Sequence, residues 1–253
     1  MVMKKGFWII LCMFFIPPVT FAGNMKLHYD RPAEYFEEAL VIGNGTMGAT
    51  LYGGVKKDKI SFNDITLWTG EPESENSSPD AFNTIPEIRA LLDNEDYQGA
   101  DKAQYKVQGH YSENYQPLGT LTIEYLDDTI GISDYHRWLD IGNATARTQY
   151  LKGGKLFTSD YFASAPDSVI VIRLKSENKE GIYALLSFDS PLPHSSQVAD
   201  NEISVEGYAA YHSFPVYYKA EDKHRYDPER GIHFKTLVRV LSVDGRVKNR
   251  YSD

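Results

Sequence analysis

The stretch EALVIGNGTMGATLYGGVKKDKISFNDITLWTG, residues 38–70, decides the fold. Within it Gly43, Gly45 and Gly48 spell G-x-G-x-x-G, a fingerprint of dinucleotide-binding sites that requires a strand before it and a helix after it. The second requirement fails, because another pair of glycines, Gly53 and Gly54, follows before one helical face could form. Short apolar runs separated by Gly and Asn instead predict successive hairpin strands, with the three glycines in a tight turn.

Composition restricts the partners that the chain could have. The 253 residues carry a formal net charge of −9, and the sequence pI is near 5.3. Nucleic-acid binding rests on clustered Lys and Arg, and no basic stripe runs through this sequence. We therefore expect no nucleic-acid partner. The length suits one large all-β domain, with two small domains as the alternative.

The N-terminus has the layout of a secretory signal. Lys4 and Lys5 form a charged region, residues 6–19 form an apolar region, and small residues stand before a cleavage site that we place after Ala22. A stable membrane anchor is the weaker reading, because the apolar run falls short of the roughly 20 residues a span requires and contains Pro17-Pro18. We therefore expect a periplasmic or secreted protein whose mature domain is residues 23–253.

The only cysteine, Cys12, lies within this signal segment, so cleavage leaves a chain without cysteine. An exported protein without disulfides must be held together by its hydrophobic core. This pattern favours a bacterial envelope protein over a small disulfide-built module. A thiol nucleophile is excluded from the mature chain.

Helical patterns are expected in one region. Thr84 is predicted to cap a first helix with Pro86 in its first turn, and apolar residues follow at helical spacing. A second helix is predicted from about Glu95 to Lys106. We interpret this pair as an insertion in a β domain.

From Pro117 onward the hydrophobic period changes to two. Leu121, Ile123 and Tyr125 alternate with polar residues, as in a strand with one buried face. The segment Val169–Leu174 is apolar on both faces, so we predict a central strand buried between layers. Further strands are expected at residues 65–68, 137–141, 146–151, 155–163, 183–188, 202–205, 216–219 and 232–241. Together these predict an all-β fold, a large antiparallel sandwich with a short two-helix insertion.

The C-terminal residues follow directly on a strand and an Asp244-Gly245 turn. An antiparallel sheet would be expected to continue there. We therefore expect the chain to be the front part of a longer protein, with a naturally short protein as the alternative.

Carboxylates and histidines are numerous but select no catalytic site. Cleavage of a glycosidic bond needs two carboxyl groups roughly 5 to 10 Å apart, and no pair stands out in the sequence. The cluster Glu71, Glu73 and Glu75 is interpreted as a solvated loop. The histidines lack the spacing of a local metal site, and no G-x-S-x-G elbow is present. We expect neither a metal nor a cofactor.

Aromatic residues make up 13% of the chain, and Tyr dominates among them. In an acidic exported β protein, exposed rings beside planar polar groups suit a sugar, which offers C–H faces and hydroxyls. Candidates for sugar contact are Trp68, Tyr111, Tyr115 and Gln116. The alternative is structural, because Tyr is favoured in strands and packs well there.

Several of these residues also carry a resemblance to a known family. The sequence resembles the N-terminal domain of glycoside hydrolase family 95, the inverting α-L-fucosidases, with α-L-galactosidases as close relatives. The resemblance covers nearly all of the mature chain. Its motifs lie at residues 31–33, 38–48, 60–70, 116–119, 135–140 and 162–170.

The resemblance implies a β-supersandwich domain followed by a helical linker, an (α/α)6 barrel and a C-terminal β domain. In this family the acid and base belong to the barrel, so no catalytic residue carries over to this chain. Loops of the sandwich can border the active site, which makes Asn44, Trp68 and His110 candidate substrate contacts. The glycines and Asn44 have turn formation as their alternative role.

Two functions follow as hypotheses. The first is a catalytically silent N-terminal domain of an exported α-L-fucosidase. In that enzyme the fucosylated glycan would bind through the catalytic domain, which is missing from this chain. The second is a stand-alone carbohydrate-binding β-sandwich module without hydrolase activity. A truncated product with unpaired strand edges is a third and weaker reading.

Overall fold

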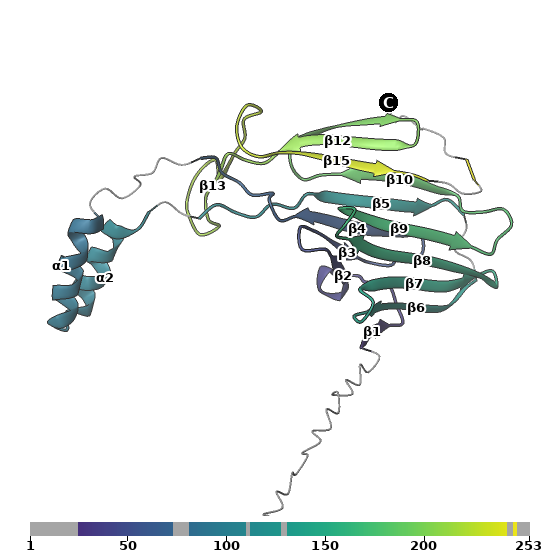
Figure 1. Cartoon of the computed structure of the whole chain (residues 1–253), viewed down its shortest axis with the longest axis horizontal. Coiled ribbons are helices and arrows are strands. Elements are labelled where there is room, and N and C mark those ends of the chain that lie inside the picture. The colour runs from purple at the N-terminus through teal and green to yellow at the C-terminus, as the bar shows by residue number, and fades with distance from the viewer. Residues whose placement is uncertain (1–24, 73–80, 110–111, 128–130, 242–244, 247–253) are drawn as a thin grey trace, which may run out of the picture.

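The computed structural model describes residues 25–72, 81–109, 112–127, 131–241 and 245–246. Within them the chain forms two five-stranded antiparallel sheets, a three-stranded sheet, a two-stranded ribbon and two α-helices (Figure 1). The predicted fold class, an all-β antiparallel sandwich with a short two-helix insertion, is confirmed.

One large sheet has the strand order β1-β6-β7-β8-β9. Strands β6 to β9 follow one another along the chain and pair in sequence, so they form a meander to which β1 is added at the edge. The strands are β1 (Lys26–Tyr29), β6 (Ile132–Asp140), β7 (Thr145–Lys152), β8 (Lys155–Ser164) and β9 (Val169–Ser176).

The second large sheet, of order β10-β5-β4-β3-β2, contains the stretch that decided the fold. Gly43 pairs with Gly48 across the β2–β3 hairpin, and Gly45 has a φ of 96°, which favours glycine in this turn. The glycine fingerprint is therefore a hairpin turn, as predicted. The strands are β2 (Leu40–Gly43), β3 (Met47–Leu51), β4 (Lys57–Asp64), β5 (Gly119–Tyr125) and β10 (Ala184–Asp189); a 3-10 helix, η1 (Phe36–Glu38), precedes them.

Two smaller β units complete the sandwich. A three-stranded sheet of order β11-β12-β15 contains β11 (His194–Ala199), β12 (Glu202–Tyr208) and β15 (His233–Arg239). A two-stranded ribbon pairs β13 (His212–Ser213) with β14 (His224–Arg225). Figure 1 places this ribbon at the end of the sandwich from which the chain runs out to the helices.

The insertion is a helical hairpin made of α1 (Ala81–Asp93), α2 (Tyr97–Gln104) and a 3-10 turn, η2 (Tyr105–Val107). The Asp96 side chain caps α2 by accepting from the Gly99 N–H at 2.9 Å. Gly99 also lets the helices approach closely, since a Cβ there would stand 3.1 Å from Leu91 Cδ2. Figure 1 shows the hairpin standing apart from the sheets. Within the described residues, neither helix has the length and apolar character needed to cross a membrane.

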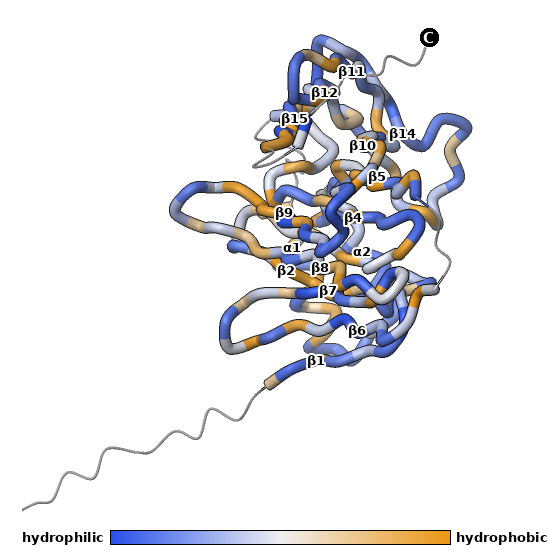
Figure 2. Tube along the Cα trace, turned by 90° about the vertical axis from the view of Figure 1, so that its right-hand side faces the viewer, coloured by the Kyte–Doolittle hydropathy of each residue, from blue (hydrophilic) through white to orange (hydrophobic). Residues whose placement is uncertain are grey.

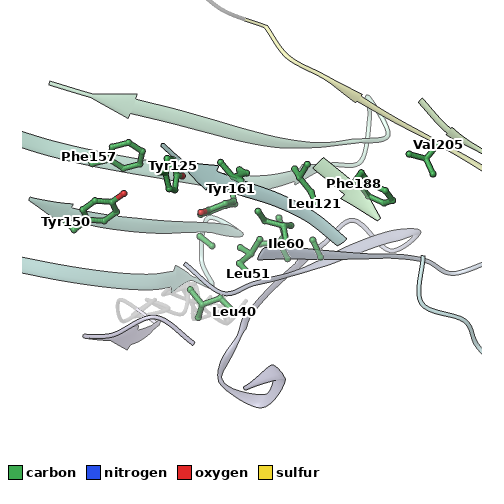
Figure 3. Packing of buried hydrophobic residues seen from close by; sticks show 14 residues of the cluster. Leu40, Leu51, Ile60, Leu121, Tyr125, Tyr150, Phe157, Tyr161, Phe188 and Val205 are labelled. Carbon is green, nitrogen blue, oxygen red and sulfur yellow. The ribbon is translucent and has the colours of Figure 1, made fainter. Parts of the chain in front are cut away.

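The core lies between the two large sheets (Figure 3). Ile60 of β4 and Ile123 of β5 are almost fully buried, and they face Tyr150 and Phe157, whose rings stack at 4.9 Å, in the other sheet. Figure 2 shows hydrophobic and hydrophilic residues interspersed along the strands. This is the alternation that one buried face produces.

Asp58 of β4 is a carboxyl group inside this core, with 1% of its surface exposed. Its Oδ2 accepts from the Tyr161 hydroxyl at 2.7 Å, and its Oδ1 accepts from the Gly54 N–H at 2.9 Å. Burial raises the pKa of Asp58 from 3.8 to about 6, although these hydrogen bonds oppose the rise.

Arg137 of β6 is also buried, with 1% exposed. It donates from Nε to the Arg31 carbonyl at 2.7 Å and from Nη1 to the Glu38 carbonyl at 2.8 Å. Its guanidinium lies 4.1 Å from the centre of the Tyr29 ring. Arg137 therefore ties the N-terminal segment to the first large sheet.

The prediction of a central strand at Val169–Leu174 is wrong, because β9 is an edge strand paired only with β8 among the described strands. Ile170, Ile172 and Leu174 pack against the core, while Val169 is 44% exposed. An apolar run does not by itself distinguish a strand covered on both faces from a strand at an edge.

Two predicted strands are turns or loops. At residues 65–68 the chain leaves β4 in a turn held by Asp64, whose Oδ1 accepts from the Thr66 N–H at 2.9 Å and from its hydroxyl at 2.6 Å. At residues 216–219 a turn closes from the Tyr218 N–H to the Pro215 carbonyl at 2.9 Å, and Val216 is 89% exposed. Local side-chain and turn hydrogen bonds prevail over β propensity at both places.

The predicted helix start is also wrong. The first helix already includes Ala81, so Thr84 is a buried residue inside it rather than its cap, and Pro86 lies beyond the first turn. The second helix falls within its predicted range.

Candidate functional site

The end of the sandwich beside the ribbon carries an exposed aromatic pair formed by Trp68 and Tyr115. The two residues form an isolated antiparallel bridge, flanked by hydrogen bonds from Gln116 N–H to the Leu67 carbonyl and from Thr69 N–H to the Asn114 carbonyl. Their ring centres are 5.6 Å apart at an interplanar angle of 59°. Trp68 is 44% exposed and Tyr115 is 42% exposed, so both rings offer surface to a ligand.

Trp68 is fixed by local hydrogen bonding. Its indole Nε1 donates to the Ile65 carbonyl at 3.0 Å, within the turn that follows β4. This bond sets the direction of the ring before any ligand arrives. A held ring loses little conformational entropy when a flat ligand face stacks on it.

A polar cluster lies directly behind this pair, around the carboxylate of Glu113. Oε2 accepts from the Thr69 hydroxyl and from the Ser213 N–H, the latter at 3.0 Å. Oε1 is 2.7 Å from Nδ1 of His212. Glu113 therefore joins the ribbon strand β13 to the segment that bears Trp68.

The cluster continues to His224, whose Nδ1 is 2.8 Å from the Ser213 hydroxyl. A hydroxyl beside an imidazole could act as a nucleophile and base. Ser213, however, is 1% exposed, so its oxygen does not face solvent where a substrate could reach it. The hydrogen bond between Ser213 and His224 therefore has a structural role, because it joins β13 to β14.

Asn44 is engaged in the β2–β3 turn. Its Oδ1 accepts from the Met47 N–H at 2.8 Å and from both polar groups of Thr46, and its Nδ2 donates to the Ser164 carbonyl at 3.0 Å. These bonds account for the residue through turn formation, the alternative role considered above. The turn lies next to the aromatic pair, because the Thr46 carbonyl accepts from the N–H of Ile65, whose own carbonyl holds Trp68.

The structure thus brings Asn44, Trp68, Tyr115 and Gln116 to one end of the sandwich. His110 and Tyr111, the remaining sequence candidates, lie outside the described residues. The Glu113 cluster was missed by sequence reasoning. Its members come from segments about a hundred residues apart, and no short spacing marks them.

The sequence predicts that the acidic residues of the loop after Trp68 are solvated. Glu71 is exposed, and it also pairs with Arg230, whose Nε donates to Glu71 Oε2 at 2.9 Å. The guanidinium of Arg230 lies 3.6 Å from the centre of the Tyr211 ring. The hydrogen bond from Arg230 holds the pKa of Glu71 below its usual range. Glu73 and Glu75 lie outside the described residues. In the part of the chain that is described, no three potential ligands gather as a metal site would require.

Comparison with known proteins identifies the family. The model described as "Glycosyl hydrolase family 65, N-terminal domain" matches residues 27–253. Alpha-L-fucosidase 2 of Arabidopsis thaliana is 31% identical over 228 residues, which are 87% of this chain and 27% of that protein. Probable alpha-fucosidase A of Aspergillus niger is 29% identical over 211 residues, 78% of this chain and 26% of that protein.

The chain spans about a quarter of the length of these curated relatives. The family match covers almost everything after the N-terminal segment, including both large sheets, the helical hairpin and the end that bears Trp68. The chain therefore belongs to the family of glycosyl hydrolase family 65 N-terminal domains.

Proposed function

We propose that this chain is the N-terminal domain of an inverting α-L-fucosidase of the glycoside hydrolase family 95 type, and that it is catalytically silent alone. The observation that carries the proposal is the match to proteins named as fucosidases, which covers most of this chain but about a quarter of theirs. Release of L-fucose from fucosylated glycans then depends on an acid and a base outside this domain.

An assay of the purified chain on 4-nitrophenyl α-L-fucoside tests the silent role. We expect the rate of nitrophenol release to equal that of the buffer blank. Turnover well above the blank, retained through a second purification step, would refute that role. The fucosidase assignment is tested separately by the reading frame downstream of codon 253, where a helical barrel with a carboxyl acid and base should be encoded.

We propose that the Trp68 end of the sandwich borders the substrate in the whole enzyme, with Asn44 and His110 as further candidates. The exposed pair of Trp68 and Tyr115 supports this role, because fixed aromatic faces suit the C–H face of a sugar. Fluorescence of Trp68 should change when 2′-fucosyllactose is added to the chain. The Trp138→Phe variant, which keeps Trp68, should retain the change, and the Trp68→Ala variant should lose it.

Export is part of the proposal. Residues 1–22 act as a signal, and the mature domain begins after Ala22 in the periplasm or outside the cell. N-terminal sequencing of the protein recovered from a periplasmic extract should start at Gly23. A start at Met1 would contradict export through this segment.

The second candidate function is a stand-alone carbohydrate-binding module. The observation that favours it is again the exposed aromatic pair, which requires no barrel in order to be held in place. Calorimetric titration of the isolated chain with fucosylated oligosaccharides should then give saturable heat. The absence of heat at millimolar sugar would leave the fucosidase-domain role as the better account.

A further inference from the structure

A concave surface lies over the small sheet β11-β12-β15. It is a shallow groove of about 650 Å³, lined by residues from all three strands. That volume lies within the range of roughly 300–1,000 Å³ found for small-molecule sites. The groove is separate from the Trp68–Tyr115 pair, because none of its lining residues belongs to that pair.

The strand register places the polar and aromatic side chains of the groove on one face. Tyr208 stands opposite His233, and Glu206 stands opposite Lys235, two residues along each strand. Residues two apart point to the same side of a sheet, so these four side chains share one face. Phe234 points to the other side and packs against the core.

An aromatic corner forms one end of the groove. The rings of Tyr208 and His233 lie 5.8 Å apart with an interplanar angle of 30°, and Tyr226 meets Tyr208 edge to face at 6.5 Å. Tyr208 is half-buried and His233 is exposed. The corner therefore combines ring faces with the polar atoms of a tyrosine and a histidine.

The other end of the groove is polar but balanced in charge. Lys235 Nζ is 2.6 Å from Glu206 Oε1, and both side chains are more than half exposed. An ion pair offers strong donors and acceptors to vicinal hydroxyls while adding no net charge. The chemistry suits a neutral ligand rich in hydroxyl groups and carrying an apolar face.

We propose that this groove is a binding site for a neutral oligosaccharide, with a sugar ring stacked in the Tyr208–His233 corner and its hydroxyls bonded to the Glu206–Lys235 pair. The site lies toward the same end of the sandwich as the ribbon, since two residues beyond Tyr208 the Ala210 carbonyl accepts from the Gly70 N–H at 3.0 Å. The proposal does not depend on the chain being part of a fucosidase.

The test is an NMR titration of the full chain with 2′-fucosyllactose, lactose and a sulfated oligosaccharide. We expect saturable shifts of amide signals at residues 206–208 and 233–235 with at least one neutral sugar. The sulfated sugar should give weaker shifts. If neither neutral sugar gives saturable shifts at about tens of millimolar, the proposal is overturned. Even a site with a millimolar dissociation constant would be occupied at that concentration.

Variants separate the groove from the aromatic pair. Tyr208→Ala should weaken binding about tenfold, since aromatic anchors dominate the binding energy of such sites. His233→Ala should weaken it as well, while Tyr35→Ala, which removes a tyrosine that is 65% exposed elsewhere, should leave it unchanged. Shifts that persist in Tyr208→Ala and His233→Ala but vanish in Trp68→Ala would refute the groove and support the proposed Trp68 site.

Discussion

The buried carboxyl of Asp58 makes the stability of the fold depend on pH between about 3.8 and 6, and one substitution should remove this contribution. The pKa of Asp58 is raised by burial from 3.8 to about 6. A raised pKa means that the protonated form stabilises the fold below pH 3.8, that this contribution is lost between pH 3.8 and 6, and that it is absent above pH 6. A difference of about 2.2 in pKa corresponds to about 3 kcal/mol in the free energy of unfolding.

Asp58→Asn imitates the protonated form. The amide oxygen can accept from the Gly54 N–H, and the amide nitrogen can donate to the Tyr161 oxygen. We expect the variant to be more stable than the parent by up to about 3 kcal/mol at pH 8 and equally stable within about 1 kcal/mol at pH 4. Urea unfolding followed by circular dichroism at both pH values measures the two differences.

The control is Asp160→Asn, whose parent carboxyl has the opposite behaviour. Burial alone would raise the pKa of Asp160, but hydrogen bonds from Arg147 and Arg173 outweigh this effect and hold it below its usual range. Its contribution to stability is present above pH 3.8 and lost as the pH falls further. Asp160→Asn should therefore lower the free energy of unfolding by the same amount at pH 6 and at pH 8. A stability difference between Asp58→Asn and the parent that stays constant from pH 4 to pH 8 would refute the argument.

Three further substitutions and one control variant test packing and hydrogen bonding. Arg137→Met removes a buried guanidinium and leaves two backbone carbonyls without their donors, so it should lower the free energy of unfolding by about 3 kcal/mol, measured by urea unfolding. Gly54→Ala should lower the free energy of unfolding by about 2–3 kcal/mol in the same assay, because its Cβ would clash with the Lys57 carbonyl. The control is Gly142→Ala, whose Cβ would make only an ordinary contact with Asp140 Oδ1 at 3.5 Å, and it should cost less than about 1 kcal/mol. Glu113→Ala removes the acceptor of the Ser213 N–H and should lower the free energy of unfolding by about 2 kcal/mol. It should also increase the quenching of Trp68 fluorescence by acrylamide. An unchanged quenching constant would contradict the role of Glu113 in supporting the segment that bears Trp68.

Sequence reasoning succeeded where one local rule decided the outcome. The alternation around Ile123 identified a strand with one buried face, and β5 has that pattern. The glycines around Gly45 predicted a hairpin, and Gly45 has the positive φ that favours glycine in its turn. Both signals lie within a few residues of the structure they specify.

The predictions failed where contacts between distant parts of the chain determine the structure. Whether β9 lies in the centre or at the edge of its sheet depends on which strands pair beside it, and its own apolar residues do not carry that information. Glu113 became central to the site because it meets His212 and Ser213, about a hundred residues further along the chain. Trp68 was correctly selected as an exposed aromatic residue, but its partner and the bond that fixes its ring follow from the fold.

The bridge between Trp68 and Tyr115 has a consequence for the whole helical hairpin. The chain leaves the sandwich just after Trp68 and returns just before Tyr115. The bridge therefore holds the two ends of this long insertion side by side. Closure of such an excursion costs only slightly more free energy as its length grows. The hairpin is therefore a replaceable module: a short glycine-rich link or a foreign domain could occupy its position while the ten strands of the two large sheets keep their register.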